Sequence, residues 1–592
     1  MRSERLTKAA ALGFVATLGM LAGCASPEKQ AAQVFDDYWQ ARLAHSPTWA
    51  TDIGVNRYND RLDDLSADED ERWSAKRRHF LKRITSIDRS HMSAMDRSNC
   101  EIFERQLRDG LLHDECHSQS VPIKHQGSPH LSLPLMLVYQ PFDTVQDYRN
   151  YISRLEGWPT QVDQVIANCR EGVNKGYVRS RVIIEKVVPQ IQSQLVDSPQ
   201  DSEFYEPIRK FPESFSEEMK QELSEAIETA ISESVLPGYR RLSAYVLDEY
   251  LPASRATVGI WDVPDGDAIY DKLIRFHTTT ELSADAIHQI GLDEIARIRG
   301  EMDKVRAEMG FVGSVDEFIT YMTTDPKFKA KSGDELMTLA QSILDRTEPK
   351  LVKLFNRLPK ARCGLKEIES FRAASAPAAY AYPPASDGSR SGYYYVNVHE
   401  ATKRPTYTME ALTYHEAYPG HLLQIPLDLE NPNLPTFRRH ASFTAYIEGW
   451  ALYAEGLGYE IGGYQTPESR FGRLAYDAWR AARLVVDTGM HRKRWTRQQA
   501  VDYMKANTGL SELNINSEVD RYISWPGQAL AYKIGELTIR KLRDDAETQL
   551  GESFDLREFH DELLSQGAQP LSILKERMNR WIAAQAEVLT AS

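Results

Sequence analysis

The sequence has few cysteines, no long apolar run and no excess of basic side chains. Of its five cysteines, the four that follow residue 24 fit neither the spacing of a zinc ribbon nor that of a redox pair. Disulfides and buried free thiols both remain open for them. The net charge of −14, without a basic patch or a recognisable motif, makes nucleic acid an unexpected partner.

No segment is long and apolar enough to cross a bilayer. The first residues are a basic start followed by a short apolar run and a segment of small residues that ends in a cysteine: Arg2, Arg5, Lys8, Ala9 to Met20, and Leu21-Ala-Gly-Cys24. This order is typical of a lipoprotein signal peptide. We therefore expect residues 1–23 to be removed and Cys24 to carry lipid, the alternative being a plain signal peptide with an incidental cysteine.

The compartment follows from this interpretation. Ala25 is not a retention signal of the aspartate type, so for a Gram-negative source we expect an outer-membrane anchor that faces the periplasm. That anchor would be the only contact with the membrane. Loss of residues 1–23 removes three basic residues and one acidic residue, which changes the net charge from −14 to −16. The oligomeric state is left open.

The chain also lacks internal repeats and low-complexity linkers, and most of it has helical periodicity. Apolar residues recur at spacings of three and four in several long stretches: Glu217 to Leu247, Ser283 to Glu308, Gly333 to Leu354 and Tyr522 to Leu550. We predict a mainly α fold with two lobes around a deep cleft. Residues 24–45 would be a tether and first helix, and residues 46–592 one domain whose N-terminal lobe ends at about residue 300.

The most informative residues are His415, Glu416 and His421. Two imidazoles and an adjacent carboxylate are the groups of a hydrolytic zinc centre. The two histidines are six positions apart, so a regular helix would point them in different directions. Pro419 and Gly420 break the helix between them, and such a break would allow both rings to face one ion. Ordinary buried histidines are the alternative.

A third ligand is expected from the apolar helix at Ser442 to Leu457. Glu448 and Glu455 are seven positions apart in it and so lie on one face. A carboxylate in such surroundings is costly unless it is paired or bound to metal. We predict Glu448 as the third zinc ligand and Glu455 as a residue that orients a histidine or the ligand carboxylate, with a surface position for Glu455 as the alternative.

At this point the chain resembles the bacterial family known as domain of unknown function 885. The resemblance covers nearly the whole chain after the signal peptide, and its segments are Ser46-Pro-Thr-Trp-Ala-Thr, Tyr151-Ile-Ser-Arg-Leu, Gly176-Tyr-Val-Arg-Ser-Arg-Val, Glu249-Tyr-Leu-Pro-Ala-Ser-Arg, Tyr382-Pro-Pro-Ala-Ser-Asp-Gly-Ser-Arg390, His415-Glu-Ala-Tyr-Pro-Gly-His421, Asp487-Thr-Gly-Met-His491 and Arg521-Tyr-Ile-Ser-Trp-Pro-Gly-Gln-Ala-Leu-Ala-Tyr-Lys533. Members look like helical zinc metallopeptidases of the gluzincin type. The family often has another histidine after His421, where this chain has Leu422, so His421 is the one candidate for the second ligand.

One strand can be predicted from the residues, at Gly392 to Val398 after the turn Ser386 to Arg390. We expect it to belong to a small β-sheet beside the zinc site. By similarity to gluzincins it would be an edge strand that pairs with the substrate beside the metal. Tyr394 and Arg390 are therefore candidate substrate-binding residues. A core strand with packed tyrosines is the alternative.

The resemblance also implies an oxyanion donor and a carboxylate-binding group from the C-terminal region. Tyr532 and His491 are the candidates for the donor, and Arg521 is the candidate for holding a substrate carboxylate. In the alternative interpretation Tyr532 only packs and Arg521 pairs with Glu518 at the surface.

Together these residues predict a zinc metallopeptidase of the cell envelope that acts on short or unfolded peptides, with one zinc ion per chain. Glu416 would take a proton from the attacking water and give it to the leaving amine. A non-catalytic lipoprotein that binds peptides or cell-wall material is the alternative from another class. Amide hydrolysis on non-peptide substrates is a third possibility.

Overall fold

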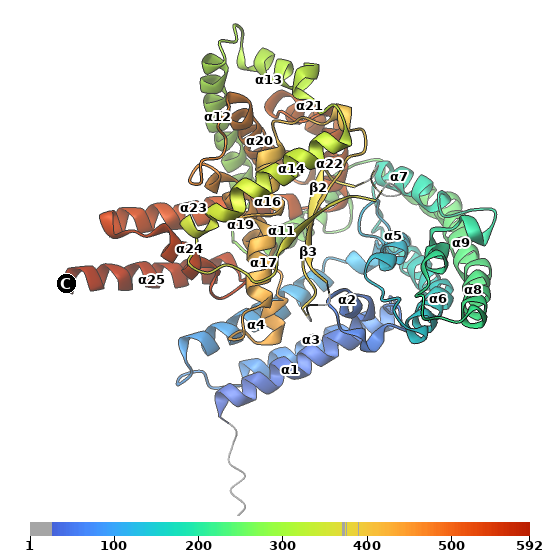
Figure 1. Ribbon diagram of the computed structural model, residues 1–592. Coiled ribbons are helices and arrows are strands. Elements are labelled where there is room, and N and C mark those ends of the chain that lie inside the picture. Colours follow the sequence, from blue (N-terminus) through green and yellow to red (C-terminus); the bar gives the residue numbers. More distant parts are fainter. Residues whose placement is uncertain (1–25, 370–372, 374–375, 387, 389, 592) are drawn as a thin grey trace, which may run out of the picture.

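Helices form most of the computed structural model, which describes residues 26–369, 373, 376–386, 388 and 390–591 (Figure 1). The one sheet within these residues has three strands. The predicted mainly α fold with a small sheet is therefore confirmed. Cys24 and part of the turn before the strand, Asp387 and Ser389, lie outside the described residues. The lobe boundary near residue 300 stays a prediction.

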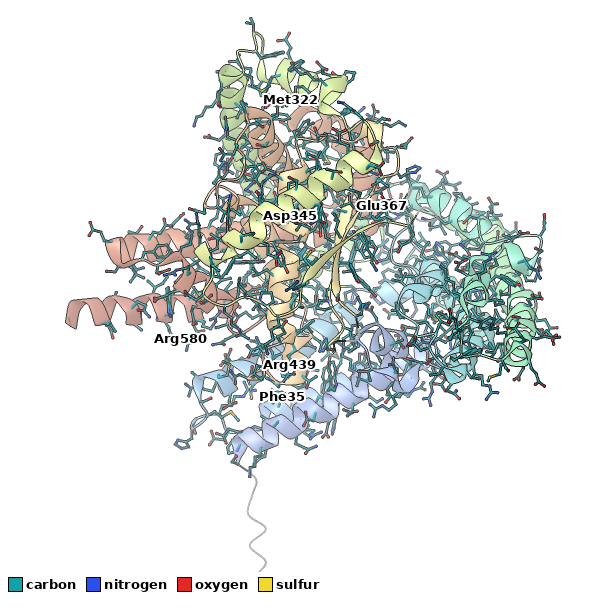
Figure 2. The ribbon with its side chains drawn as sticks, in the orientation of Figure 1. Phe35, Met322, Asp345, Glu367, Arg439 and Arg580 are labelled. Carbon is teal, nitrogen blue, oxygen red and sulfur yellow. The ribbon has the colours of Figure 1, made fainter. Side chains whose placement is uncertain are left out.

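The N-terminal helices pack around aromatic side chains. Helix α1 begins at Pro27, and the Ser26 hydroxyl accepts a hydrogen bond from the Lys29 N–H at 3.5 Å. Phe35 of α1 packs against Phe437 of the short helix α18, with ring centroids 4.6 Å apart. Side chains fill the space between the helices of this region (Figure 2). The elements are α1 (Pro27–His45), α2 (Pro47–Asp52), α3 (Ala67–Thr85), α4 (Ala94–Asp114) and α18 (Thr436–Arg439).

A second hydrophobic core lies within residues 123–250. Its largest buried side chains include Trp158 and Tyr239. The predicted helix at Glu217 to Leu247 is present as two α-helices joined by a π-helical turn at Ile231–Val235. The helices here are α5 (Pro129–Leu135), α6 (Val145–Lys175), α7 (Arg181–Gln192), α8 (Glu217–Ala230), α9 (Leu236–Tyr245) and α10 (Leu251–Ala253).

The largest core contains the helices that position the candidate site. Two helix pairs pack side by side, α12 with α20 and α19 with α23. In the second pair Gly449 and Gly535 let the backbones approach so closely that a Cβ on Gly449 would lie 2.5 Å from the Gly535 Cα. The helices are α11 (Gly266–Thr278), α12 (Ala284–Glu308), α13 (Val315–Thr324), α14 (Gly333–Thr347), α16 (Met409–Glu416), α17 (His421–Leu429), α19 (Thr444–Leu457), α20 (Pro467–His491), α21 (Arg497–Asn507), α22 (Glu512–Ser524), α23 (Ala531–Leu550), α24 (Leu556–Leu564) and α25 (Leu571–Ala591).

One predicted helix is interrupted. The stretch from Tyr522 to Leu550 is not continuous, because α22 ends at Ser524 and α23 begins at Ala531. Between them stand Pro526, which cannot donate a helical hydrogen bond, and Gly527, whose φ of +82° is left-handed. The periodicity of the apolar residues alone did not reveal this break.

The sheet has the order β1–β3–β2, with β1 parallel and β2 antiparallel to β3. Its strands are β1 (Cys363–Glu367), β2 (Ala379–Tyr382) and β3 (Gly392–Val396). The predicted strand is thus confirmed, but its assignment as an edge strand is wrong. Both edges of β3 are hydrogen-bonded, one to β1 and the other to β2, so its backbone cannot pair with a substrate. The edge strand that reaches the candidate site is β2, whose Ala381 N–H donates to Glu416.

The four cysteines Cys100, Cys116, Cys169 and Cys363 are free thiols. Burial raises the pKa of Cys100 and of Cys116 to about 11. Within the described ranges, no helix has the length and apolar character required to cross a membrane.

Candidate metal centre

A break between two helices brings the two histidines together. Helix α16 ends at Glu416, helix α17 begins at His421, and the Tyr418–Pro419 peptide between them is cis. At Gly420 a Cβ atom would lie 1.9 Å from the His415 carbonyl oxygen, so no larger residue fits this turn. The Trp450 indole N–H on α19 donates to the Pro419 carbonyl at 3.1 Å. The predicted break is therefore present.

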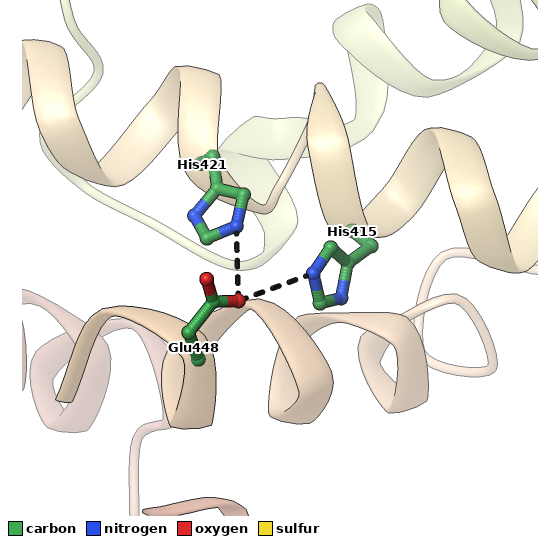
Figure 3. Close-up of side chains that lie close together, drawn as sticks. All are labelled: His415, His421 and Glu448. Carbon is green, nitrogen blue, oxygen red and sulfur yellow. Dashed lines mark ion pairs between the residues drawn. The ribbon is translucent and has the colours of Figure 1, made fainter. Parts of the chain in front are cut away.

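His415, His421 and Glu448 converge on one point (Figure 3). The Oε2 atom of Glu448 lies 3.5 Å from Nε2 of His415 and 3.4 Å from Nε2 of His421. One ligand atom from each of the three residues lies within 4.8 Å of the other two. The histidines are buried, whereas the Glu448 side chain keeps 20% of its surface exposed. The two imidazoles are therefore shielded from solvent, whereas solvent can reach the carboxylate.

These separations fit a bound metal ion better than hydrogen bonds. Ordinary N–H···O bonds span about 2.7–3.2 Å, so the contacts to Glu448 are long. Two ligands about 2.1 Å from a tetrahedral zinc ion lie about 3.4 Å apart. Glu448 Oε2 and His421 Nδ1 are buried without a hydrogen-bond partner among the described residues. Two imidazole nitrogens and one carboxylate oxygen also leave a fourth position for water.

The charges of the three groups reinforce one another. Burial opposes ionisation of Glu448, but His421 and His415 beside it hold the pKa of Glu448 well below its usual value. Burial would also lower the pKa of His415, yet Glu448 and Glu455 raise it to about 9. Without a metal, His415 therefore carries a proton at neutral pH. A metal ion would have to displace that proton.

Glu455 fixes the orientation of the His415 ring through a hydrogen bond to Nδ1. Its Oε1 atom accepts a hydrogen bond from Nδ1 of His415 at 3.0 Å, which leaves Nε2 directed toward Glu448. Its side chain is fully buried, so the alternative of a surface position is wrong. Arg480 lies 3.3 Å from the same oxygen, and Arg473 lies 4.0 Å from the other. Despite burial, these neighbours hold the pKa of Glu455 below its usual value.

Glu416 lies next to the candidate ligands and is tied to the sheet. Its Oε2 atom accepts a hydrogen bond from the Ala381 N–H of β2 at 2.9 Å. The side chain is only partly exposed, and burial raises the pKa of Glu416 above its ordinary value, although His415 and His421 oppose the rise. A carboxylate with a raised pKa is suited to accept a proton from water.

Tyr532 lies beside His415. It comes from the first turn of α23, and its ring is nearly parallel to that of His415, with centroids 6.4 Å apart. The guanidinium of Arg483 lies 4.2 Å from the centre of the tyrosine ring. Burial, followed by the charge of Glu448, raises the pKa of Tyr532, so its hydroxyl keeps its proton at neutral pH.

The contacts of His491 are with backbone groups and give no support to its predicted role as oxyanion donor. The Ile260 N–H donates to its Nδ1 at 3.0 Å, and its Nε2 lies 3.0 Å from the Tyr522 carbonyl oxygen. Because Nδ1 accepts, Nε2 must carry the proton and donate it to that carbonyl. Burial lowers the pKa of His491 to about 3. Both ring nitrogens are thus occupied by backbone groups.

The three predicted substrate-binding residues are also engaged within the protein. Tyr394 is fully buried in the central strand, with its hydroxyl 3.3 Å from that of Thr413, so it cannot contact a substrate. Arg390 donates to the carbonyls of Pro383 and Asp52. The guanidinium of Arg521 bonds to Glu518 and Gln528. The pairing with Glu518 was the alternative interpretation for Arg521, although the pair is largely buried.

Two arginines of α20 were missed by sequence reasoning. Arg480 supports Glu455, and Arg483 covers Tyr532 while donating to the Tyr522 hydroxyl and to Glu518. The available signal was the position of these charges among the apolar residues of the segment Trp479 to Val486, where a cation must find a partner. Their partners lie on three other helices, which periodicity cannot identify.

Comparison with known proteins places this site in a family. The family described as "Bacterial protein of unknown function (DUF885)" matches residues 47–578. The chain belongs to this family. No curated protein matches it. The DUF885 chain is similar to a crystal structure described as a putative lipoprotein from Colwellia psychrerythraea, with 30% identity, a TM-score of 0.90, and coverage of 94% of this chain and 100% of the other.

A second solved structure supports the fold of the DUF885 chain. It is described as a putative lipoprotein of unknown function from Shewanella oneidensis, with 18% identity and a TM-score of 0.72. The similarity covers 94% of this chain and all of the other. The predicted family membership is confirmed, and the structural relatives are described as lipoproteins.

Proposed function

We propose that this DUF885 protein is a zinc-dependent peptidase of the cell envelope, with zinc held by His415, His421 and Glu448. The observation that carries the proposal is the separation of 3.4 to 3.5 Å between Glu448 and each imidazole, which suits ligands of one ion. Two imidazoles and one carboxylate favour zinc over calcium or magnesium. A bound zinc ion supplies Lewis acidity, which lowers the pKa of water and polarises a substrate carbonyl.

Glu416 is proposed as the general base. It accepts the proton of the attacking water and then transfers it to the leaving amine, so the carboxylate is regenerated. Its raised pKa brings it closer to neutrality, and its hydrogen bond to the Ala381 N–H orients one oxygen and leaves the other for the proton. Glu455 is a positioning residue, because it fixes the ring of His415.

Tyr532 is proposed as the donor to the oxyanion that forms at the carbonyl carbon. Its ring stacks on that of His415, and the guanidinium of Arg483 lies 4.2 Å from the centre of the tyrosine ring. A neutral hydroxyl can donate a hydrogen bond to an oxygen that gains charge during the reaction. This position supports the role expected for Tyr532, whereas the contacts of His491 give no support to the same role.

Peptides are the proposed substrates, and lipidation of Cys24 is the proposed anchor. The description of both structural relatives as lipoproteins supports an envelope location. A binding protein without catalysis is the competing proposal. The partly buried carboxylate of Glu416 beside the ligand group favours an enzyme, since a binding protein has no need of a base there.

The test is the substitution Glu416→Gln in the mature protein. The amide keeps the size of the side chain and leaves the three candidate ligands unchanged, but it cannot accept the proton. We expect zinc content and melting temperature to stay close to wild type while cleavage of a broad peptide library falls by about 10²–10⁴-fold. Glu233→Gln, at an exposed position of the π-helical turn, is the matched control.

Mass spectrometry of the digested library reads out the result. A wild-type protein with full zinc occupancy that cleaves no peptide would rule out the peptidase and favour the binding protein. Equal cleavage by wild type and Glu416→Gln would remove Glu416 from the mechanism.

A further inference from the structure

A large cavity is lined by strand β2, the strand whose Ala381 N–H donates to Glu416. Its volume is about 680 Å³, and it lies between β2 and the helices α5 and α7. Most of its lining is apolar, including Leu131, Pro134, Val138, Val196 and Pro377. Ligand sites in proteins commonly have volumes of roughly 300–1,000 Å³. The cavity therefore has room for more than one residue of a peptide.

Strand β2 connects the cavity to the catalytic groups. Tyr380 and Tyr382 line the cavity, while the N–H of Ala381 between them donates to Glu416 at 2.9 Å. The three metal-binding candidates are not part of the lining. A peptide that lies beside β2 could therefore have one group near Glu416 and a neighbouring side chain in the cavity.

The ionisable residues that line the cavity are all acidic. Three of the lining residues are acidic, Asp52, Asp201 and Glu203, and no lysine, arginine or histidine is among them. Asp52 is partly compensated, because it accepts a hydrogen bond from the Tyr382 hydroxyl at 2.7 Å and lies 3.8 Å from Arg390. Glu203 is half-buried, and burial raises its pKa, so an incoming cation would favour the charged form and an incoming carboxylate would oppose it. An acidic side chain entering the cavity would meet like charge in a partly dry environment.

We propose that this cavity is a specificity pocket that receives apolar and lysine-like side chains of the peptide substrate and rejects acidic ones. The proposal rests on the peptidase function proposed above. Apolar walls would take up the aliphatic parts, and Glu203 together with Asp201 would attract a terminal ammonium group. The pocket would thus select substrates by charge as well as by size.

The experiment measures binding, so that it does not depend on turnover. The protein is the mature chain with Glu416→Gln, loaded with zinc, and calorimetry gives the dissociation constants. The probes are N-acetylated, C-amidated hexapeptides of leucine and alanine that carry one lysine or one glutamate at each position in turn. At one position at least, we expect the lysine peptide to bind about tenfold tighter than the glutamate peptide, a difference of about 1.4 kcal/mol.

Two additional substitutions test the cavity itself. Glu203→Gln should reduce the preference for lysine several-fold, and Val138→Trp should fill the cavity and weaken binding of the leucine-rich peptides about tenfold. The controls are Glu185→Gln, on an exposed position of α7, and Val312→Trp, where the side chain is 95% exposed. Circular dichroism confirms that each variant is folded, and the Glu203 result does not depend on the fold of the tryptophan variant.

The outcomes separate the pocket from the peptidase. Equal binding of the lysine and glutamate peptides at every position, or no binding of any peptide, would overturn the pocket. Cleavage of the library by wild type that is unaffected by Glu203→Gln and Val138→Trp would overturn the pocket and leave the peptidase in place. Charge-selective binding by a protein that cleaves nothing would retain the pocket and reject the peptidase.

Discussion

The turn between the two histidine ligands is the most sensitive point of the candidate site, and Gly420→Ala tests it. The added Cβ would lie 1.9 Å from the His415 carbonyl oxygen and 2.4 Å from that of Tyr414. Side-chain Cβ atoms essentially never approach within 3.0 Å, so the backbone has to move by at least 1.1 Å. That movement acts directly on His415 and on the start of α17 at His421.

The size of this displacement predicts the loss of metal. Metal ligands tolerate distance errors of about 0.2 Å, so a movement of 1.1 Å takes at least one imidazole out of range. Substitutions that only disturb the support of a ligand already cost about 10–100-fold in affinity. We therefore expect Gly420→Ala to lose at least about 100-fold in zinc affinity. Crowding in a packed region should also destabilise the fold by about 1–3 kcal/mol.

The assay is zinc competition against a chromophoric chelator, combined with thermal unfolding followed by circular dichroism. Gly300→Ala is the matched control, because Gly300 is exposed on α12 and a Cβ atom added there would meet no neighbouring group within 4 Å. That control should be neutral or stabilising by about 0.5–1 kcal/mol. A folded Gly420→Ala protein with wild-type zinc affinity and melting temperature would refute the role assigned to this turn.

Three other measurements address the metal, the oxyanion and the anchor. Because the pKa of His415 is about 9 without metal, zinc binding at pH 7 should release about one proton, and zinc affinity should rise about tenfold per pH unit up to pH 8. Calorimetry in buffers of different ionisation enthalpy measures this release, and binding heats that do not depend on the buffer would contradict it. Tyr532→Phe should lower kcat by about 10²–10³-fold if its hydroxyl donates to the oxyanion, whereas the exposed control Tyr459→Phe should be neutral. Cys24→Ala should move the protein from the membrane fraction to the soluble fraction, and membrane association that persists after a salt wash would place the anchor elsewhere.

The ligand group could be predicted from the sequence because its information is local. His415 and His421 are separated by an adjacent proline and glycine, a pair that disfavours a continuous helix, and Glu448 is a charge in an apolar helix. Each of these signals lies within a few residues of the side chain concerned. The structure has the break and the convergence that they predicted.

The surroundings that the sequence did not reveal depend on long-range contacts. The partners of His491 are a backbone N–H 231 positions away and a carbonyl 31 positions away. Strand β3 is central because β1 and β2 both pair with it, and strand composition does not distinguish a central strand from an edge strand. Tyr394 was therefore assigned to the substrate although its ring lies in the core.

The start of helix α1 at Pro27 limits how a lipidated protein could move. Pro27 follows Cys24 by only three positions, and three extended residues reach about 10 Å. With lipid on Cys24, the short linker would hold the folded domain close to the bilayer surface, whereas a long flexible linker would let it move away. Its rotation would be restricted, and large substrates approaching from the membrane side would be hindered. A lengthened spacer after Cys24 would free the body without changing any residue of the metal centre.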